Sequence, residues 1–375
     1  MNPREAEALV EPSAAAPLDF YDYPYAELTK LLVDRFDATP YRATQLFEWA
    51  YRQGVSDLSA MTNISRELRE TLALNLAFPK AKIHERQISQ DGTRKYVFEV
   101  EDGALVESVM IKQPNRMTLC VSSQVGCAMA CAFCRTGTMG LKRNLSTSEI
   151  IRQVVAVIED AKNFGDSFQN IVFMGMGEPL HNFNGVTRAV KILTDPHGFG
   201  MSPRKITVSS VGLVPAIKKL AASDVEVSLA VSLNATTDEI RSTIMPINDR
   251  FPIAELLQTI REFPLGPRKS VTIEYVMLHG INDSLEDLKR LPKILRGLRV
   301  KVNLIPYNEN AGLGFKMPPK EWVHTWQRSL NATGLQATIR WSKGADIKAA
   351  CGQLATTSVR APRAALMQVA EAAVS

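Results

Sequence analysis

The sequence contains little of what marks a membrane protein, a secreted protein or a structural zinc protein. No uninterrupted apolar run approaches the roughly 20 residues that a membrane-spanning helix needs. The N-terminus, MNPREAEALVEPSAAAP, lacks the basic segment and apolar stretch of a signal peptide. Only five cysteines and five histidines occur in 375 residues. We therefore expect a cytoplasmic protein without a membrane partner, in a compartment where free thiols and an oxygen-sensitive cofactor survive.

Positive charge is in only slight excess over negative charge. The chain has 44 lysines and arginines against 39 aspartates and glutamates, a net charge of +5. This balance permits an RNA partner without arguing for one, because an ordinary slightly basic protein has it too. The length suits one large domain and a smaller one, and a hydrophobic content of 45% is that of a globular protein.

Four of the five cysteines lie close together, and three of them are spaced as Cys127-x-x-x-Cys131-x-x-Cys134. Thiolate sulfur selects iron–sulfur clusters, zinc or copper(I), and close spacing lets three sulfurs converge without long loop closures. Three ligands suit a cubane cluster that keeps one iron without a protein ligand. A four-coordinate zinc site would need a second Cys or His pair, and none follows. Zinc, and buried cysteines without a metal, are kept as alternatives.

Three changes of pattern divide the chain. Apolar residues recur three and four apart from Tyr25 to Leu76, which predicts helices. The period then becomes two, and Asp91-Gly92 and Asp102-Gly103 are typical hairpin turns. The organisation that we expect is a disordered lead at 1–20, a helical accessory domain at 21–80, a small β-hairpin extension at 81–115, a core at 116–355 and a C-terminal tail at 356–375.

The core alternates apolar strands with helical patterns. The expected strands are Thr118–Ser123, Ile171–Met174, Ile206–Ser209, Val227–Leu233, Thr272–Leu278 and Val302–Pro306. Apolar strands separated by helices indicate a parallel sheet with right-handed crossovers. Six units are too few for a closed eight-stranded barrel, so the sequence predicts an α/β fold with a partial (β/α)6 barrel.

Polar residues follow several of these strands, and ligands of such sheets bind at the carboxyl ends of strands. Gly177-Glu178 follows the second strand, where glycine allows close approach of the backbone and glutamate can accept from an ammonium group. Ser209, Asn234 and Asn308 end other strands. Each of these taken singly is more often a turn or cap residue.

The fifth cysteine, Cys351, stands far from the others in Gly344–Leu354. A single distant cysteine is more often a small buried apolar residue than a nucleophile. The flanking Gly352 and Gln353 suggest an accessible loop instead, where a thiolate could react.

These motifs carry a family resemblance. The loop Cys127-x-x-x-Cys131-x-Phe133-Cys134 resembles the signature of the radical SAM superfamily, and the run from Cys120 to Leu145 is similar to the RlmN family of RNA methyltransferases and to its relative Cfr. The resemblance implies a radical SAM barrel, one 4Fe–4S cluster, and S-adenosylmethionine (SAM) used twice per turnover. It also implies that the helical accessory domain helps to bind RNA.

The resemblance assigns roles to individual residues. The cluster ligands would be Cys127, Cys131 and Cys134, and the SAM contacts Gly177, Glu178, Ser209, Ser232, Leu233, Asn234 and Asn308. Cys351 would carry the methyl group, Cys120 would resolve the adduct by forming a disulfide with it, and Glu107 or Cys120 would take the ring proton. Because the two sulfurs must meet, we expect Cys120 and Cys351 to lie across one cavity.

The function that follows is methylation of adenine carbon 2 in 23S rRNA and in tRNA, at the adenine 3′ of the anticodon. The target base must be unstacked, and an electron donor such as flavodoxin is expected to serve a monomeric enzyme. Candidate phosphate contacts are Lys142, Arg143, Arg204 and Lys205. The alternatives are Cfr-like methylation of carbon 8, a radical SAM enzyme for a small molecule, and a non-catalytic zinc-containing RNA-binding protein.

Overall fold

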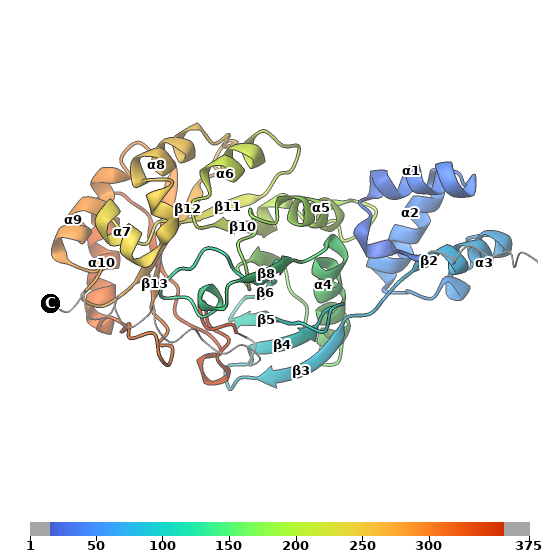
Figure 1. Cartoon of the computed structure of the whole chain (residues 1–375), viewed down its shortest axis with the longest axis horizontal. Coiled ribbons are helices and arrows are strands. Elements are labelled where there is room, and N and C mark those ends of the chain that lie inside the picture. Colours follow the sequence, from blue (N-terminus) through green and yellow to red (C-terminus); the bar gives the residue numbers. More distant parts are fainter. Residues whose placement is uncertain (1–15, 356–375) are drawn as a thin grey trace, which may run out of the picture.

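The computed structural model describes residues 16–355, which form a helical lobe and a larger α/β core (Figure 1). The expected tail at 356–375 and most of the expected lead lie outside the described residues. The last residues of that lead differ from the expectation, since β1 (Leu18–Asp19) pairs with β2 (Leu76–Ala77) and Phe20 is fully buried. Order therefore begins before residue 20, because the aromatic ring of Phe20 packs among those of the helical lobe.

The helical lobe forms where the three-and-four spacing predicts it. Its helices are α1 (Tyr25–Phe36), α2 (Tyr41–Phe47), the π-helical turn η2 (Glu48–Gln53) and α3 (Arg66–Asn75), with short 3-10 turns η1 (Phe20–Asp22) and η3 (Leu58–Ala60). Leu28, Leu32, Leu46 and Phe47 are fully buried in it. One contact of the lobe with the core is at the start of helix α4 (Thr147–Lys162), where the backbone N–H of Ser148 donates to Asp22.

The core is built on one ten-stranded sheet in the order β14-β13-β12-β11-β10-β9-β6-β5-β4-β3. Its strands are β3 (Lys82–Ile88), β4 (Arg94–Glu99), β5 (Leu105–Gln113), β6 (Arg116–Cys120), β9 (Asn170–Phe173), β10 (Ile206–Ser210), β11 (Ser228–Ser232), β12 (Val271–Met277), β13 (Val300–Pro306) and β14 (Ala337–Ile339). The six expected parallel strands are confirmed. The short seventh, β14, was not predicted because three residues give no clear period.

The expected hairpin extension is not a separate unit. Strands β3, β4 and β5 pair antiparallel, and β5 also pairs antiparallel with β6. These strands therefore extend the sheet beyond β6, at the edge opposite β14. The sheet therefore has a parallel half, from β6 to β14, and an antiparallel half, from β3 to β6.

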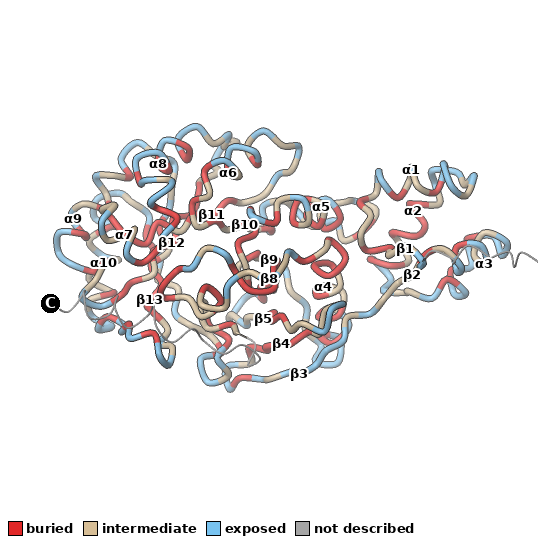
Figure 2. The backbone as a smooth tube through the Cα atoms, in the orientation of Figure 1, coloured by how far each residue is buried: buried red, intermediate tan, exposed pale blue. Residues whose placement is uncertain are grey.

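Helices flank the strands on the outside of the curved sheet (Figure 1), and buried residues run along the strands (Figure 2). These helices are α4 (Thr147–Lys162), α5 (Phe183–Thr194), α6 (Val214–Ala221), α7 (Asp238–Ile244), α8 (Ile253–Glu262), α9 (Leu285–Ile294) and α10 (Lys320–Ala332), and the remaining 3-10 turns outside the site are η5 (Pro203–Lys205) and η6 (Pro246–Asp249). A capping box of Ser146 and Glu149 begins α4. Within residues 16–355, every helix is too short or too polar to cross a membrane.

Candidate active site

The three-cysteine loop is an insertion between β6 and α4. Strands β7 (Gln124–Gly126) and β8 (Leu141–Asn144) pair antiparallel and close its base, and the 3-10 turn η4 (Thr136–Met139) lies between them. Gly126 has a φ of 78°, and a Cβ there would overlap the backbone of Gly140. Only glycine therefore allows the two strands to approach so closely.

The loop folds back on itself and buries its thiols. A Cβ on Gly137 would stand 2.9 Å from the carbonyl oxygen of Cys131. The tip is tied to the end of α7 by a hydrogen bond of 3.0 Å from the backbone N–H of Ala132 to the carbonyl of Ile244. Burial raises the pKa of Cys127 to about 12 and that of Cys131 well above its ordinary value. Such thiols stay protonated until a metal centre takes them as thiolates.

The three thiols of this loop are the donor set that an iron–sulfur cluster takes. Among residues 16–355, no three His, Cys, Asp or Glu side chains converge closely enough to hold one metal ion. Cys127, Cys131 and Cys134 stay the residues predicted to hold a cluster.

A cavity of about 160 Å³ opens beside this loop, at the carboxyl ends of the parallel strands, and we call it the strand-end cavity. Of the residues named from the sequence, it is lined by Cys131, Cys134, Gly177, Glu178, Ser209, Ser232, Asn234, Asn308 and Cys351. Leu233 does not line it and packs into the core. The structure therefore brings two of the three predicted cluster cysteines, six of the seven expected SAM contacts and Cys351 to one place.

Glu178 is a deeply buried acceptor on the wall of this cavity. Its two carboxylate oxygens accept from the backbone N–H groups of Leu180, at 3.2 Å, and Val211, at 3.0 Å. Burial raises the pKa of Glu178 to about 7. Gly177, with a φ of 100°, turns the chain there, where a Cβ would stand 2.5 Å from that of Gln124. A charged ligand group would complete the solvation that Glu178 lacks.

Other polar side chains on the wall hold neighbouring strand ends together. Ser209 donates to the carbonyl of Phe173 at 2.7 Å, and Asn234 accepts from the N–H of Val276 at 2.8 Å. The fully buried Arg241, which the sequence did not reveal as important, donates to the carbonyls that end two of these strands, with its Nη2 2.7 Å from the carbonyl oxygen of Val211. The loops that surround the cavity are therefore fixed by hydrogen bonds.

The loop that carries Cys351 lies against the three-cysteine loop. Asn308 donates to the carbonyl of Cys351 at 3.1 Å, and the N–H of Arg135 donates to the carbonyl of Gly352 at 2.8 Å. Thr136 donates to the carbonyl of Leu354 at 2.6 Å. Cys351 is half-buried, so it is neither a surface thiol nor a core residue.

Cys120 and Cys351 line a second, narrower cavity of about 40 Å³, which we call the thiol cavity. Cys120 is buried at the end of β6, and burial raises its pKa to about 12, partly offset by the guanidinium of Arg340. All five cysteines are free thiols, so the expected disulfide between Cys120 and Cys351 is not formed in this structure. Cys120 and Cys351 therefore line the same cavity as two reduced thiols.

Two charged residues of the site were missed from the sequence. Arg340 lines both cavities, and its side chain contacts the thioether of Met174 at 3.4 Å. Glu274 lies inside β12, and one of its oxygens has no hydrogen-bond partner among the described residues. A glutamate within the apolar run Val271–Met277 is a signal that could have found Glu274.

Glu107 lies apart from both cavities, in the middle of β5. It is buried, and its carboxylate stands 3.8 Å from the ammonium of the equally buried Lys95 on β4. Burial raises the pKa of Glu107 to about 7, although Lys95 acts in the opposite direction. Val109, two residues further on the same face of β5, pairs with Cys120 and lines the thiol cavity.

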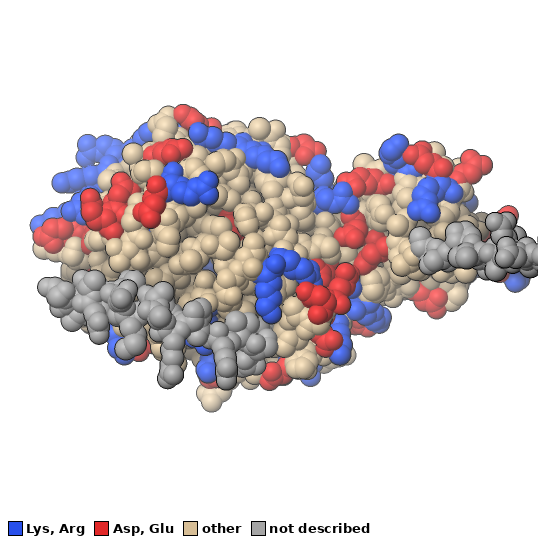
Figure 3. Space-filling model, in the orientation of Figure 1, with Lys and Arg blue, Asp and Glu red and all other residues tan. Residues whose placement is uncertain are grey.

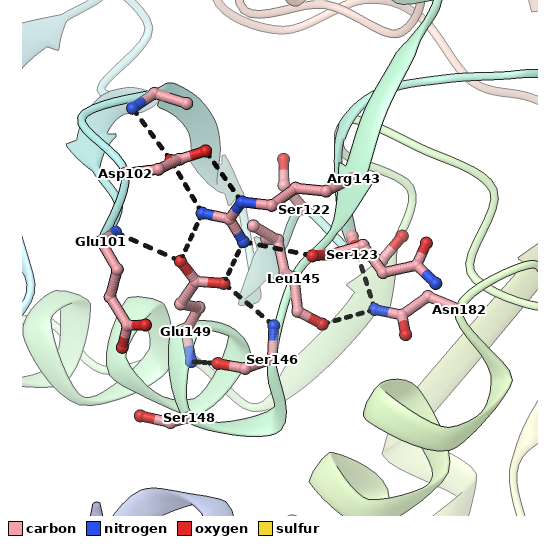
Figure 4. Close-up of polar contacts among 12 residues, drawn as sticks. Glu101, Asp102, Ser122, Ser123, Arg143, Leu145, Ser146, Ser148, Glu149 and Asn182 are labelled. Carbon is pink, nitrogen blue, oxygen red and sulfur yellow. Dashed lines mark hydrogen bonds and ion pairs between the residues drawn. The ribbon is translucent and has the colours of Figure 1, made fainter.

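One of the candidate phosphate contacts is engaged elsewhere. Arg143 lies between Asp102 and Glu149 and donates to both carboxylates, at 2.8 and 2.9 Å to Asp102 and 2.7 and 2.8 Å to Glu149 (Figure 4). Its charge is thus neutralised within the protein, which is why the expectation fails for it. Lys142, Arg204 and Lys205 are exposed and stay predictions. On the face shown in Figure 3, basic and acidic side chains are interspersed.

Comparison with known sequences identifies the family. The family model of the radical SAM superfamily matches residues 121–291, and that of the ribosomal RNA large subunit methyltransferase N-terminal domain matches residues 18–77. The dual-specificity RNA methyltransferase RlmN of Geobacter sulfurreducens is 50% identical over 318 residues, which are 84% of this chain and 86% of that one. This chain belongs to the RlmN family.

Two further comparisons agree with that membership. The dual-specificity RNA methyltransferase RlmN 2 of Myxococcus xanthus is 46% identical over 355 residues, 93% of each chain. The crystal structure of a radical SAM methyltransferase from Sphaerobacter thermophilus superposes with a TM-score of 0.84 at 44% identity and covers 90% of this chain and 99% of that one. Membership of the radical SAM superfamily implies SAM and a 4Fe–4S cluster. The alternative of a non-catalytic zinc-containing protein receives no support from these relatives.

Proposed function

We propose that this RlmN-family protein methylates carbon 2 of adenine in 23S rRNA and in tRNA, at the adenine 3′ of the anticodon, through a methyl group carried on Cys351. The observation that carries the proposal is the placement of Cys351 on the walls of both cavities, one shared with two cluster cysteines and the other with Cys120. The names of the relatives, which are dual-specificity RNA methyltransferases, support RNA as the substrate.

Cys351 is the nucleophile of the proposed reaction. Carbon 2 of adenine is electron-poor, so it cannot attack a sulfonium methyl directly, and a thiolate carrier avoids that difficulty. The Cys351 thiolate accepts a methyl group from one SAM and becomes S-methylcysteine. When bound at Cys127, Cys131 and Cys134, the cluster with a second SAM supplies radical chemistry that activates this methyl group for addition to the base.

Cys120 and Glu107 complete the reaction. The radical adduct gives up its ring proton to a base, for which Glu107 or Cys120 is proposed, and one electron to an acceptor, a role that the bound cluster would supply. The sulfur of Cys120 then attacks that of Cys351, the bond from Cys351 sulfur to the transferred carbon breaks, and this carbon takes up a proton to become the methyl group on the RNA. An external two-electron reductant returns the new disulfide to two thiols. The guanidinium of Arg340, which lines both cavities, favours the thiolate form of Cys120.

The remaining residues bind and orient. Glu178 is proposed to accept from the ammonium group of SAM, while Ser209, Asn234 and Asn308 face the same cavity. The helical lobe at residues 21–80 is proposed to help bind RNA. The enzyme is further proposed to act as a monomer in the cytoplasm, with an electron donor such as flavodoxin.

The deciding experiment is mass spectrometry of protein and RNA. Protein isolated from cells should carry one methyl group on Cys351, and RNA treated with it anaerobically, with SAM and a reductant, should yield 2-methyladenosine after digestion. Unmodified RNA alongside a protein that cleaves SAM would reject the proposal. Because no described residue distinguishes carbon 2 from carbon 8 by its chemistry, 8-methyladenosine as the product would favour the Cfr-like alternative instead.

A further inference from the structure

The segment that joins β14 to the Cys351 loop forms the rim of the thiol cavity. Trp341, Ser342 and Lys343 all line that cavity together with Cys120 and Cys351. Trp341 is 37% exposed, whereas Cys120 is only 4% exposed. The indole therefore stands at the outer edge of the cavity whose inner wall holds the two thiols.

The protein holds this rim in one position. The backbone N–H of Arg340 donates to Leu304 at 2.8 Å, the hydroxyl of Ser342 donates to Asn308, and the N–H of Gly344 donates to Asp91 at 3.0 Å. The indole of Trp341 rests beside the ring of His324, with ring centroids 5.6 Å apart. An anchored aromatic ring loses little further entropy when it binds a partner.

A single exposed apolar side chain is normal on a protein surface, so exposure alone says little. What distinguishes Trp341 is its neighbours, because cationic side chains precede and follow it at Arg340 and Lys343 and line the same cavity. An aromatic ring beside cations at the mouth of a reaction cavity has the chemistry that binds single-stranded RNA, in which bases stack and phosphates pair with lysine.

We propose that Trp341 is a stacking residue for an unpaired RNA base next to the target adenine and that Lys343 contacts the adjoining phosphate. This proposal rests on the proposed function and adds to it the surface that receives the RNA. When the target adenine is drawn out of its stack, the neighbouring base loses that stacking partner and gains the indole instead, which lowers the cost of presenting the target to the thiols.

The test compares four variants of the full-length, cluster-loaded protein with the wild type. W341A removes the ring, W341F keeps an aromatic face, K343A removes the cation, and L285A removes an exposed apolar side chain on α9 as the matched control. The probe is a tRNA anticodon stem-loop with adenine 3′ of the anticodon. Its dissociation constant and KM are measured at several salt concentrations, and methylation of Cys351 by SAM is measured without RNA.

We expect W341A to weaken RNA binding about tenfold at every salt concentration, and W341F to stay within about twofold of wild type. K343A should lower the slope of log affinity against log salt by about one. L285A should bind as the wild type does, and all variants should methylate Cys351 normally. Unchanged RNA affinity of W341A overturns the proposal, as does loss of Cys351 methylation in W341A, which would make the ring a support of the cavity. A wild type that methylates Cys351 but not the RNA would instead reject the proposed function.

Discussion

The two halves of the sheet contribute to the site in different ways. In the parallel half, many site residues lie at the carboxyl ends of the strands or just after them, as Glu178 and Asn234 do. In the antiparallel half, Glu107 and Lys95 lie within β5 and β4, deep in the sheet. One half presents groups to a cavity of about 160 Å³, and the other buries a pair of opposite charges 3.8 Å apart.

We expect this difference to separate ligand binding, in the parallel half, from proton transfer, in the antiparallel half. Side chains at parallel strand ends are held by backbone hydrogen bonds and face a ligand space, so altering them should change affinity. A buried carboxylate and ammonium depend on each other for solvation, so altering one should change the proton affinity of the other. Each prediction below tests whether the two halves keep these separate roles.

The largest effects are expected for the cysteines. C131A should lose the iron of the cluster and all RNA methylation, because a buried three-thiolate site cannot hold a cubane with two ligands. C351A should keep its iron and still cleave SAM under reduction, yet leave the RNA unmethylated below detection. Iron analysis and RNA mass spectrometry check both, and RNA product from C351A would contradict the carrier role.

Removal of the charge of Glu178 should weaken SAM binding. E178Q keeps the shape but loses a charged acceptor, and a hydrogen bond to a charged group is worth enough to lower the affinity for SAM about tenfold to a hundredfold. E239Q, at an exposed glutamate of α7, is the matched control and should bind SAM normally. Calorimetric titration of cluster-loaded protein gives the dissociation constants. An E178Q protein with wild-type affinity would remove Glu178 from the site.

The parallel half could be predicted from the sequence because its signals lie within short stretches of the chain. Continuous apolar strands, helices between them and polar residues at strand ends predicted the sheet and several of the residues that line the strand-end cavity. Leu233 was the exception, since its side chain points into the core although its neighbours Ser232 and Asn234 line the cavity. Successive side chains of a strand point to opposite faces, and this alternation decides which of the three residues faces the cavity. The family resemblance alone does not show it.

The buried charges of the antiparallel half could not be predicted from such local signals. On spacing alone Glu107 is an ordinary exposed strand residue, and only the family resemblance marked it. Its burial and the pairing with Lys95 follow from the register of β4 against β5, which depends on contacts between strands. Arg340 was missed for a similar reason, because β14 is too short to show a period.

Lys95 should set the pH at which Glu107 works as a base. The pKa of Glu107 is raised to about 7 by burial while Lys95 lowers it, so K95M should raise it further. The acid form would then dominate at pH 7, and RNA methylation should fall about fivefold there and recover as the pH rises. The other groups that face Glu107 are Glu85 on β3, which raises its pKa, and the backbone N–H of Ala355, which lowers it.

K95R is the control for this prediction, because it keeps the cation and should keep the acid limb of the pH–rate profile near that of wild type. SAM affinity should be unchanged in both variants, since neither Lys95 nor Glu107 lines the strand-end cavity. If the pH–rate profile of K95M has the same shape as that of the wild type and differs only in the maximal rate, the ion pair only supports the fold.

The smallest effect on catalysis is expected where the two halves are joined. Arg143, on β8 of the three-cysteine loop, bonds Asp102 in the turn between β4 and β5 and Glu149 at the start of α4 (Figure 4). R143M leaves the buried carboxylate of Glu149 with backbone donors alone, so the free energy of unfolding should fall by about 2 kcal/mol. R204M, at an exposed arginine, should leave stability unchanged but lower the salt slope of RNA binding by about one. Denaturant unfolding and RNA titrations distinguish them, and a reduced salt slope in R143M at unchanged stability would return Arg143 to the phosphate contacts.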